Sequence, residues 1–197
     1  RNLIKSKFES CSHQEWINYC SNLKRKFPYE KESTFKGKYI EVYSFIRVLS
    51  DYCKANSIII PDDGGHLTWF MQSYKVKLGQ RIFSAFGNSP MGYSFPAAIG
   101  ASIALNKKRI ICIDGDGSFQ MNIQELATIM HNKIPMKIFI FNNGGYLTIK
   151  QTQILGFNRR IMGADKKQLS VRSSYNLAAL SFTPEELYKE IQKKINN

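Results

Sequence analysis

The sequence predicts an α/β fold, namely a doubly wound, mostly parallel sheet with helices on both faces. Two apolar runs, residues 110–113 and 138–141, have the length of buried strands. A segment with helical spacing of its apolar residues separates them, and Pro135 stops that helix. Each run ends in polar residues and glycines, at 114–118 and at 142–145. Strand, helix and strand in this order form a βαβ unit, which is typical of parallel sheets.

Length and composition fit one large domain with an appended arm. The chain has 197 residues, of which 43% are hydrophobic, enough to furnish a core. Its formal net charge is +13, but the lysines and arginines are spread along the chain instead of being gathered in one motif. We therefore expect a basic surface that favours anionic ligands, and we do not expect nucleic acid as a partner.

Cysteine and membrane patterns exclude further classes. The four cysteines form no Cys-x-x-Cys pair, so we expect neither a metal site nor a redox site from them. No apolar run reaches the roughly 18 residues that a membrane span requires, and the N-terminus has no signal-peptide pattern. We therefore expect no membrane partner and a cytoplasmic location.

The chain is predicted to begin with an arm. Residues 1–35 should form an N-terminal linker arm with one helix, and residues 36–197 should form the domain. Apolar residues recur at roughly helical spacing between His13 and Phe27, and Pro28 ends that helix.

Within the domain, an amphipathic helix over 42–56 precedes a first buried strand over 57–60. This strand ends in a polar loop at 61–66, and a helix is predicted to start at His66. The other predicted elements, in chain order, are a strand at 81–85, a helix rich in small residues at 97–104, a short helix from 146, a loop at 155–175, a strand at 177–182 and a last helix ending near 195.

Polar residues that follow successive strands are predicted to meet at one edge of the sheet. In an open parallel sheet, ligands bind beyond the carboxyl ends of the strands. Asp116 and Asn143 follow two different strands, and both would lie at this edge. Mg²⁺ prefers octahedral oxygen ligands and is usually bound by one or two side chains together with substrate phosphates. A carboxylate, an amide oxygen and a loop carbonyl such as that of Gly145 would leave room for phosphate oxygens.

Glycines at the same edge would admit an anion. Gly115 and Gly117 let the backbone pass close to a ligand. The backbone amides that open the helix after Ser118 would point toward it. The sequence therefore predicts a diphosphate held through Mg²⁺.

Two segments resemble a known family. Gly115-Asp116-Gly117-Ser118, followed downstream by Asn142-Asn143, resembles the cofactor motif of thiamine diphosphate enzymes. The upstream segment from Gly87 to Ala101 resembles the one that precedes this motif in acetolactate synthases and related 2-keto acid decarboxylases and ligases. The resemblance implies a thiamine diphosphate-binding (PP) domain, with thiamine diphosphate and Mg²⁺ as cofactors.

The resemblance also implies which residues contact the metal and the diphosphate. Asp116, Asn143 and the Gly145 carbonyl would bind Mg²⁺. His66 would donate to the terminal phosphate. Gly65 stands where the family often has glutamine, so one phosphate contact would be lost. Gly115, Gly117 and Ser118 would line the diphosphate.

Further residues are implied to contact the thiamine part of the cofactor. A bulky apolar residue at the position of Met91 holds thiamine in a bent V shape in the resembled enzymes. The Ser89 carbonyl would accept a hydrogen bond from the aminopyrimidine, although the family commonly has glycine there. Tyr146 would cover the diphosphate and the pyrimidine, and the following Leu147-Thr148 departs from the family pattern.

The resemblance covers about residues 40–155 well and matches only one domain of a three-domain subunit. In the family, the glutamate that starts catalysis lies in a separate pyrimidine-binding domain, usually of another subunit. The implied partners are therefore a 2-keto acid, a pyrimidine-binding domain of the same or another subunit, and further copies in a full-length homodimer or tetramer. We assign no catalytic residue to this chain, and we expect it to bind cofactor weakly and not to turn over alone.

Two other interpretations stay open at this point. The chain could be the PP subunit of a two-chain keto acid decarboxylase of the sulfopyruvate or phosphonopyruvate type. The N-terminal arm argues mildly against this, since a free-standing subunit needs no linker helix. From another class, the chain could be a non-catalytic basic module that binds nucleotides.

Overall fold

The computed structural model describes residues 13–27, 41–164 and 181–182. By their contacts, the chain divides into two compact units, Arg1–Gly37 and Lys38–Asn197. Among the described residues, no helix combines the length and the apolar character that crossing a bilayer would need.

The first unit contains helix α1 (Gln14–Lys26), which confirms the helix predicted between His13 and Phe27. Its last turn carries three basic residues, whose charge stabilises the negative end of the helix dipole. The interpretation of residues 1–35 as a linker arm stays a prediction.

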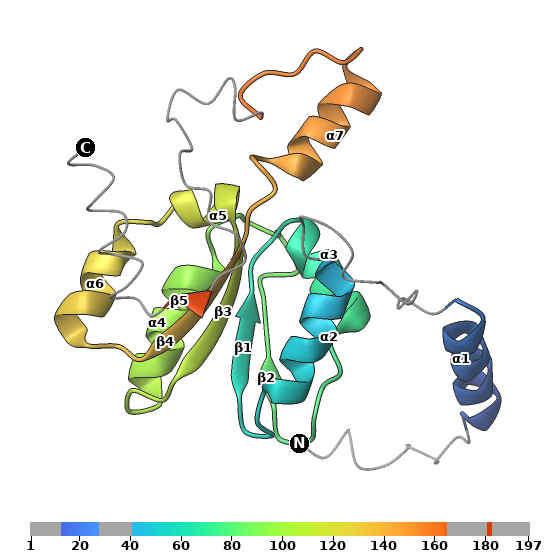
Figure 1. Ribbon diagram of the computed structural model, residues 1–197, viewed down its shortest axis with the longest axis horizontal. Helices are drawn as coiled ribbons and strands as arrows, with labels where there is room; N and C mark the ends of the chain where they lie inside the picture. The colour runs from blue at the N-terminus through green and yellow to red at the C-terminus, as the bar shows by residue number, and fades with distance from the viewer. Residues whose placement is uncertain (1–12, 28–40, 165–180, 183–197) are drawn as a thin grey trace, which may run out of the picture. The chain divides into compact units, whose positions relative to one another are not determined.

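The second unit contains one sheet, with the strand order β2-β1-β3-β4-β5 in the described part of the chain (Figure 1). The strands are β1 (Ile58–Pro61), β2 (Arg81–Ile82), β3 (Ile110–Gly115), β4 (Met136–Phe141) and β5 (Ser181–Phe182). The first four run parallel to their neighbours, and β5 pairs antiparallel with β4. The mostly parallel sheet is thus confirmed.

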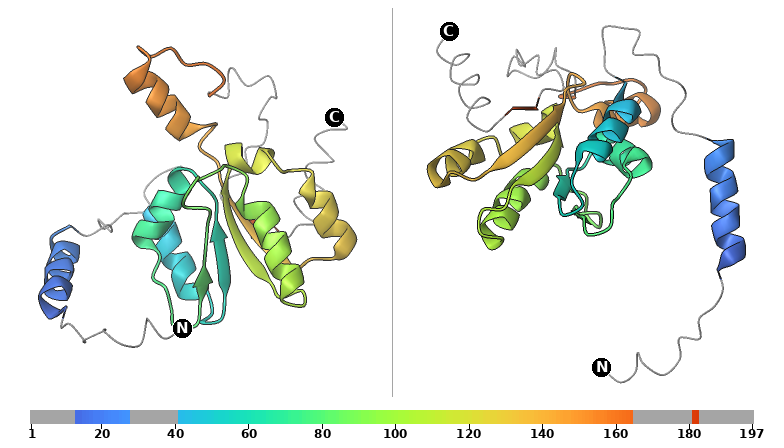
Figure 2. Two further views of the ribbon diagram at one scale, coloured as in Figure 1. Left: turned by 180° about the vertical axis from the view of Figure 1, so that it is seen from behind. Right: turned by 60° about the horizontal axis from the view of Figure 1, so that its bottom comes forward.

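Helices lie on both faces of this sheet, which confirms the doubly wound fold (Figure 2). The helices of this unit are α2 (Val42–Tyr52), α3 (Gly65–Ser73), α4 (Ser94–Ala104), α5 (Asp116–Gln120), α6 (Glu125–Asn132) and α7 (Leu147–Gly156). Side chains of β1 alternate between the two faces. Ile58 and Ile60 belong to the core under α4 and α6, whereas Ile59 belongs to the core under α2 and α3.

Helix α2 ends at Tyr52, earlier than the predicted end at residue 56. The ammonium group of Lys77 donates to the carbonyl oxygens of Asp51 and Cys53, at 2.7 and 2.6 Å. The last carbonyls of a helix have no hydrogen-bond donor within the helix. Here the distant Lys77 side chain is their donor. Sequence periodicity alone does not reveal such a contact.

The polar segment 114–118, predicted as a loop, is partly strand and partly helix. The last two residues of β3 pair with Ile140 and Phe141 of β4, which extends the strand. Helix α5 then starts directly at Asp116. The helix therefore begins before Ser118, and not after it as predicted.

Two further predictions had wrong bounds. Strand β2 has two residues where 81–85 was predicted, because after it only the Phe83 N–H still reaches β1, at 3.4 Å from the Ile59 carbonyl oxygen. Helix α7 occupies the start of the loop predicted at 155–175. The rest of that loop, most of the strand predicted at 177–182 and the predicted last helix lie outside the described residues.

The strand order reverses its direction between β1 and β3. From β1 the chain proceeds to β2 on one side, and β3 then lies on the other side of β1. Loops that leave the carboxyl ends of two such strands diverge, and ligands of open α/β sheets bind at this switch point. The residues after β1 and after β3 are therefore those that the fold brings to a ligand.

Candidate cofactor site

Asp116 connects the loops that follow β3 and β4. One carboxylate oxygen, Oδ2, accepts hydrogen bonds from the backbone N–H groups of Gly144 and Gly145, at 3.0 and 2.8 Å. Both glycines have positive φ, +83° and +133°, which a residue with a side chain rarely adopts. The glycine pair thus lets the loop after β4 turn two successive amides toward one carboxylate.

The side-chain amide of Asn143 faces the other oxygen of the same carboxylate. Its nitrogen donates to Asp116 Oδ1 at 3.3 Å and to the carbonyl oxygen of Gly145 at 2.7 Å, the orientation that satisfies all three groups. A cation among these groups would require the amide to turn over and present its oxygen.

With the Asn143 amide turned over, its oxygen, Asp116 Oδ1 and the Gly145 carbonyl oxygen would have a spacing close to that around a magnesium ion. Oxygen ligands of octahedral Mg²⁺ lie about 2.0–2.1 Å from the metal and therefore about 2.9 Å from one another. The structure thus brings together Asp116, Asn143 and Gly145, the three residues that the sequence predicted as metal ligands. Burial raises the pKa of Asp116 above its usual value, and backbone amides, that of Gly145 foremost, oppose this. A cation would favour the charged carboxylate.

Helix α5 is held closely on two sides. A Cβ atom at Gly117 would come within 2.6 Å of ring carbons of Tyr146, so only glycine fits beneath this ring. The Ser118 hydroxyl donates to the Asp63 carbonyl oxygen at 3.0 Å, which joins α5 to the loop after β1. The Ser118 hydroxyl is therefore already engaged within the protein. At an anion, α5 would contribute its backbone amides instead.

His66 lies beneath the backbone that joins β3 to α5. Its side chain is 4% exposed, and its ring is stacked on Phe141 with 6.4 Å between the ring centroids. A Cβ atom at Gly115 would lie 3.0 Å from the ring. Burial lowers the pKa of His66 to about 4, against the opposing charge of Asp62, so the ring is neutral at pH 7.

One nitrogen of this ring has no partner. Nε2 of His66 is buried and forms no hydrogen bond within the described residues. An unpaired buried polar atom is costly and uncommon in proteins. The neighbouring Gly65 starts α3, and a Cβ there would lie 3.1 Å from the Trp69 ring. For the predicted phosphate contact, Nε2 of His66 would have to reach the phosphate from beneath the backbone that joins β3 to α5.

The segment that contains Met91 lies against the end of α5. Ser89 has φ +47°, a left-handed conformation that favours glycine. Met91 is half-buried. A Cβ atom at Gly92 would meet the Asn122 side chain at 2.8 Å and the carbonyl oxygen of Ser118 at 3.5 Å. The structure therefore brings this segment and the loop after β3 to the same edge of the sheet.

Comparison with known families agrees with this geometry. The sequence matches the family described as "Thiamine pyrophosphate enzyme, C-terminal TPP binding domain" over residues 62–196. Thiamine pyrophosphate is the same molecule as thiamine diphosphate.

The chain belongs to this family of thiamine pyrophosphate-binding domains. The acetolactate synthase isozyme 1 large subunit of Escherichia coli (strain K12) is 31% identical over 156 residues, which are 79% of this chain and 27% of that subunit. Acetolactate synthase 3, chloroplastic, of Brassica napus is 41% identical over 128 residues, 65% of this chain and 19% of that protein. The acetolactate synthase large subunit of Cyanidium caldarium is 32% identical over 187 residues, 92% of this chain and 31% of that subunit. The chain spans less than a third of the length of these relatives.

The sequence did not predict the buried polar cluster below the site of this thiamine pyrophosphate-binding domain. Ligand atoms of Asp62, His66 and Asp114 lie within 4.8 Å of one another, and all three side chains are buried. Asp114 accepts from the Gly115 N–H at 2.8 Å and from the Ser94 hydroxyl at 3.2 Å. Burial and the charge of Asp62 raise the pKa of Asp114 well above its usual range. Since hydrogen bonds occupy its carboxylate, we interpret the cluster as an internal polar network.

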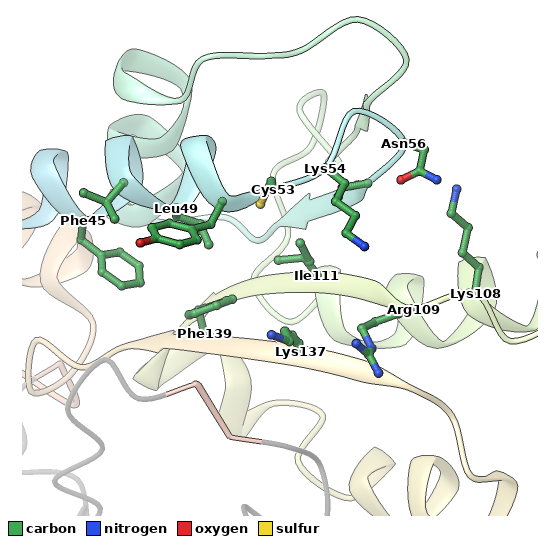
Figure 3. A pocket seen from close by; sticks show the side chains of 13 residues that line it. Phe45, Leu49, Cys53, Lys54, Asn56, Lys108, Arg109, Ile111, Lys137 and Phe139 are labelled. Atoms are coloured by element: carbon green, nitrogen blue, oxygen red, sulfur yellow. The ribbon is translucent and has the colours of Figure 1, made fainter.

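A large hollow of this domain lies elsewhere. An open pocket of about 580 Å³ has an apolar floor that includes Leu49, Ile111 and Phe139, and a basic rim that includes Lys54 and Lys137 (Figure 3). Its lining also includes the residues just before β1 and β3, so it lies at the amino ends of the strands. No predicted cofactor residue lines it. The pocket is therefore not the thiamine diphosphate site, despite its size.

Proposed function

We propose that this chain is the diphosphate- and Mg²⁺-binding part of a thiamine diphosphate-dependent enzyme that decarboxylates a 2-keto acid and joins the product to an acceptor, as the name acetolactate synthase implies for its relatives. One observation carries the proposal. The Asn143 side-chain amide lies 3.3 Å from Asp116 Oδ1 and 2.7 Å from the Gly145 carbonyl oxygen, so three potential metal ligands from loops after two adjacent strands meet at one point. The relatives named above support the carboligase over the two alternative interpretations.

Asp116, Asn143 and the Gly145 carbonyl would hold Mg²⁺ on one side. Mg²⁺ seldom has an all-protein shell, so diphosphate oxygens and water would complete its coordination. The Gly144 and Gly145 amides keep the Asp116 carboxylate in place through Oδ2, and Oδ1, which faces the Asn143 amide, would bind the metal. The metal would thus fix the diphosphate to both loops.

The diphosphate would lie over the start of α5 and α3. Gly65, Gly115 and Gly117 would line the diphosphate with their backbones, since rings of Trp69, His66 and Tyr146 fill the space where side chains would stand. Amides at helix starts favour negative charge. Ser118 would contribute its amide, since its hydroxyl is engaged by Asp63. His66 would donate from Nε2, the ring atom that has no partner within the described residues, in the tautomer that carries the single proton of the neutral ring on this nitrogen.

The thiamine part would contact the segment at Ser89 and Met91. A backbone carbonyl at Ser89 would accept from the aminopyrimidine, and the half-buried Met91 would support the bend between the rings. Tyr146, packed on Gly117, would cover the cofactor from the other side. When bound, thiamine diphosphate supplies the electron sink for decarboxylation. These residues would orient it and exclude water.

The proposal includes partners beyond this chain. A pyrimidine-binding domain, in the same or another subunit, would contribute the glutamate that starts the reaction. A homodimer or tetramer would follow for the full-length protein, in the cytoplasm. The isolated chain would bind cofactor weakly without turnover, and measurable pyruvate decarboxylation by it would contradict this.

Isothermal titration calorimetry of the 197-residue chain with thiamine diphosphate tests the proposal. Binding should require Mg²⁺ and disappear with excess chelator, because the metal joins the diphosphate to the protein. Asn143→Ala should weaken binding, whereas Asn132→Ala, an exposed asparagine at the end of α6, is the matched control. No metal-dependent binding, together with salt-sensitive oligonucleotide binding, would replace the proposal with the basic-module interpretation.

A further inference from the structure

The turn before α4 is fastened by a buried carboxylate from another loop. Asp62, which directly follows β1, is 0% exposed. Its Oδ2 accepts from the Gly92 N–H at 2.8 Å, and its Oδ1 accepts from the Ser94 N–H at 2.6 Å. Both oxygens of one charged group thus hold two amides of the turn, and hydrogen bonds to charged groups are the strong ones.

The same turn is fastened from its other side. The Asn122 side-chain nitrogen donates to the Gly92 carbonyl oxygen at 2.6 Å. Gly92 has φ +86°, and a Cβ there would lie 2.8 Å from that nitrogen. Both backbone polar groups of Gly92 are therefore bound by side chains, in a conformation and a space that admit only glycine.

The two side chains come from the loops of the candidate cofactor site. Asp62 directly precedes the loop that leads to Gly65 and His66, and Asn122 follows α5, which begins with Asp116. Met91 directly precedes Gly92. The position of Met91 is therefore tied to both loops through one residue.

We propose that Asp62 and Asn122 are positioning residues that hold Met91 at a fixed distance from the diphosphate and metal loops. This inference rests on the proposed function, since it assigns Met91 to the thiamine part of the cofactor. Neither side chain needs to touch the cofactor. Releasing Gly92 lets Met91 move relative to the loops, so the thiamine part loses its support while the diphosphate part keeps its own.

The test compares two ligands on the full 197-residue chain, both with Mg²⁺. We call the bonds of Asp62 and Asn122 to Gly92 the Gly92 clamp. Asn122→Ala removes the bond to the Gly92 carbonyl, which is one side of this clamp. Its affinity for thiamine diphosphate should fall about tenfold, the size expected for one lost hydrogen bond to a buried group, and its affinity for inorganic pyrophosphate should stay within about twofold. Asn132→Ala, which also removes a side-chain bond to a backbone carbonyl, that of Thr128, should change neither.

Other outcomes overturn the inference. An equal loss for both ligands would show that Asn122 only maintains the fold, and no loss would show that the clamp is irrelevant. A wild-type chain that binds neither ligand sinks the proposed function instead. If the wild-type chain binds neither ligand, or if Asn122→Ala does not fold, hydrogen exchange in Asp62→Asn tests without a ligand whether Asp62 holds the turn. The Gly92 and Ser94 amides should exchange at least about tenfold faster, and unchanged exchange overturns the inference.

Discussion

The two edges of the sheet differ in what their side chains bond to. At the carboxyl edge, the Asp116 carboxylate accepts hydrogen bonds from two backbone amides of the loop after β4. The Ser118 hydroxyl donates to the loop after β1. At the amino edge, the cations Lys54, Lys108 and Lys137 surround an apolar floor. Within the described part of the chain, their side chains form no ion pair or hydrogen bond that ties one loop to another.

This difference separates a large hollow from a constructed site. The amino-edge pocket has volume and positive charge, but within the described residues no side-chain contact holds the ammonium groups of Lys54, Lys108 and Lys137 in one orientation. At the carboxyl edge, donors and acceptors are held in place by contacts between loops, and glycines let neighbouring rings pack against the backbone. Preorganised polar groups, more than volume, identify a binding site.

The strongest way to break the comparison is to remove the central carboxylate. Asp116→Ala should lower the affinity for thiamine diphosphate with Mg²⁺ on the order of a thousandfold, because a metal ligand is lost and the Gly144 and Gly145 amides lose their acceptor. Calorimetry measures this directly. Asp116→Asn, which keeps an acceptor but removes the charge, should show an intermediate loss, and wild-type affinity in either variant would contradict the assigned metal ligand.

The next effect concerns pH and His66. Its pKa is lowered from 6.5 to about 4, because burial disfavours the charged ring. The folded state then binds fewer protons than the unfolded state, so this contribution to stability is complete above pH 6.5 and is lost as the pH falls toward 4. The difference 6.5 − 4 corresponds to about 3 kcal/mol in the free energy of unfolding.

Urea unfolding between pH 7 and pH 4 tests this contribution. Carboxylates titrate in the same range, so the measurement compares wild type with His66→Gln, which cannot be protonated there. The wild type should lose more stability than the variant over this interval. Parallel curves for the two proteins would show that His66 is not held neutral by burial.

Part of this edge could be predicted from the sequence. Asp116 and Asn143 were found because each follows an apolar run, and because strands of a parallel sheet end at one edge. Gly115 and Gly117 were predicted to admit an anion. The structure adds that Gly117 lies under the Tyr146 ring, a contact between segments that no local pattern indicates.

The rest depended on contacts between distant residues. The bonds of Asp62 and Asn122 to Gly92 join segments 30 positions apart and have no periodicity in the sequence. Strand β3 continues through Gly115 because it pairs with β4, which overrides the turn preference of aspartate and glycine. Burial of His66 likewise depends on which way the loop after β1 folds.

A smaller effect follows from the tight contact at Gly117. Gly117→Ala would place a Cβ within 2.6 Å of the Tyr146 ring, and overpacking of this kind costs about 1–3 kcal/mol. The same substitution in a Tyr146→Ala background should cost less, because the ring is gone. A double-mutant cycle by urea unfolding, with cofactor affinity measured in parallel, gives the coupling. Additive effects would mean that the ring is not what excludes a side chain.

The smallest effect is expected at the amino edge. Lys54→Ala removes one cation from the pocket rim, where the side chain is exposed and connects no loops. Its unfolding free energy should change by less than about 0.5 kcal/mol, and the affinity for thiamine diphosphate by less than about twofold. If positive charge alone attracted the diphosphate, this loss would instead weaken binding in low salt and the effect would fade as salt is added. A salt series with wild type and variant therefore separates a site made by geometry from one made by net charge.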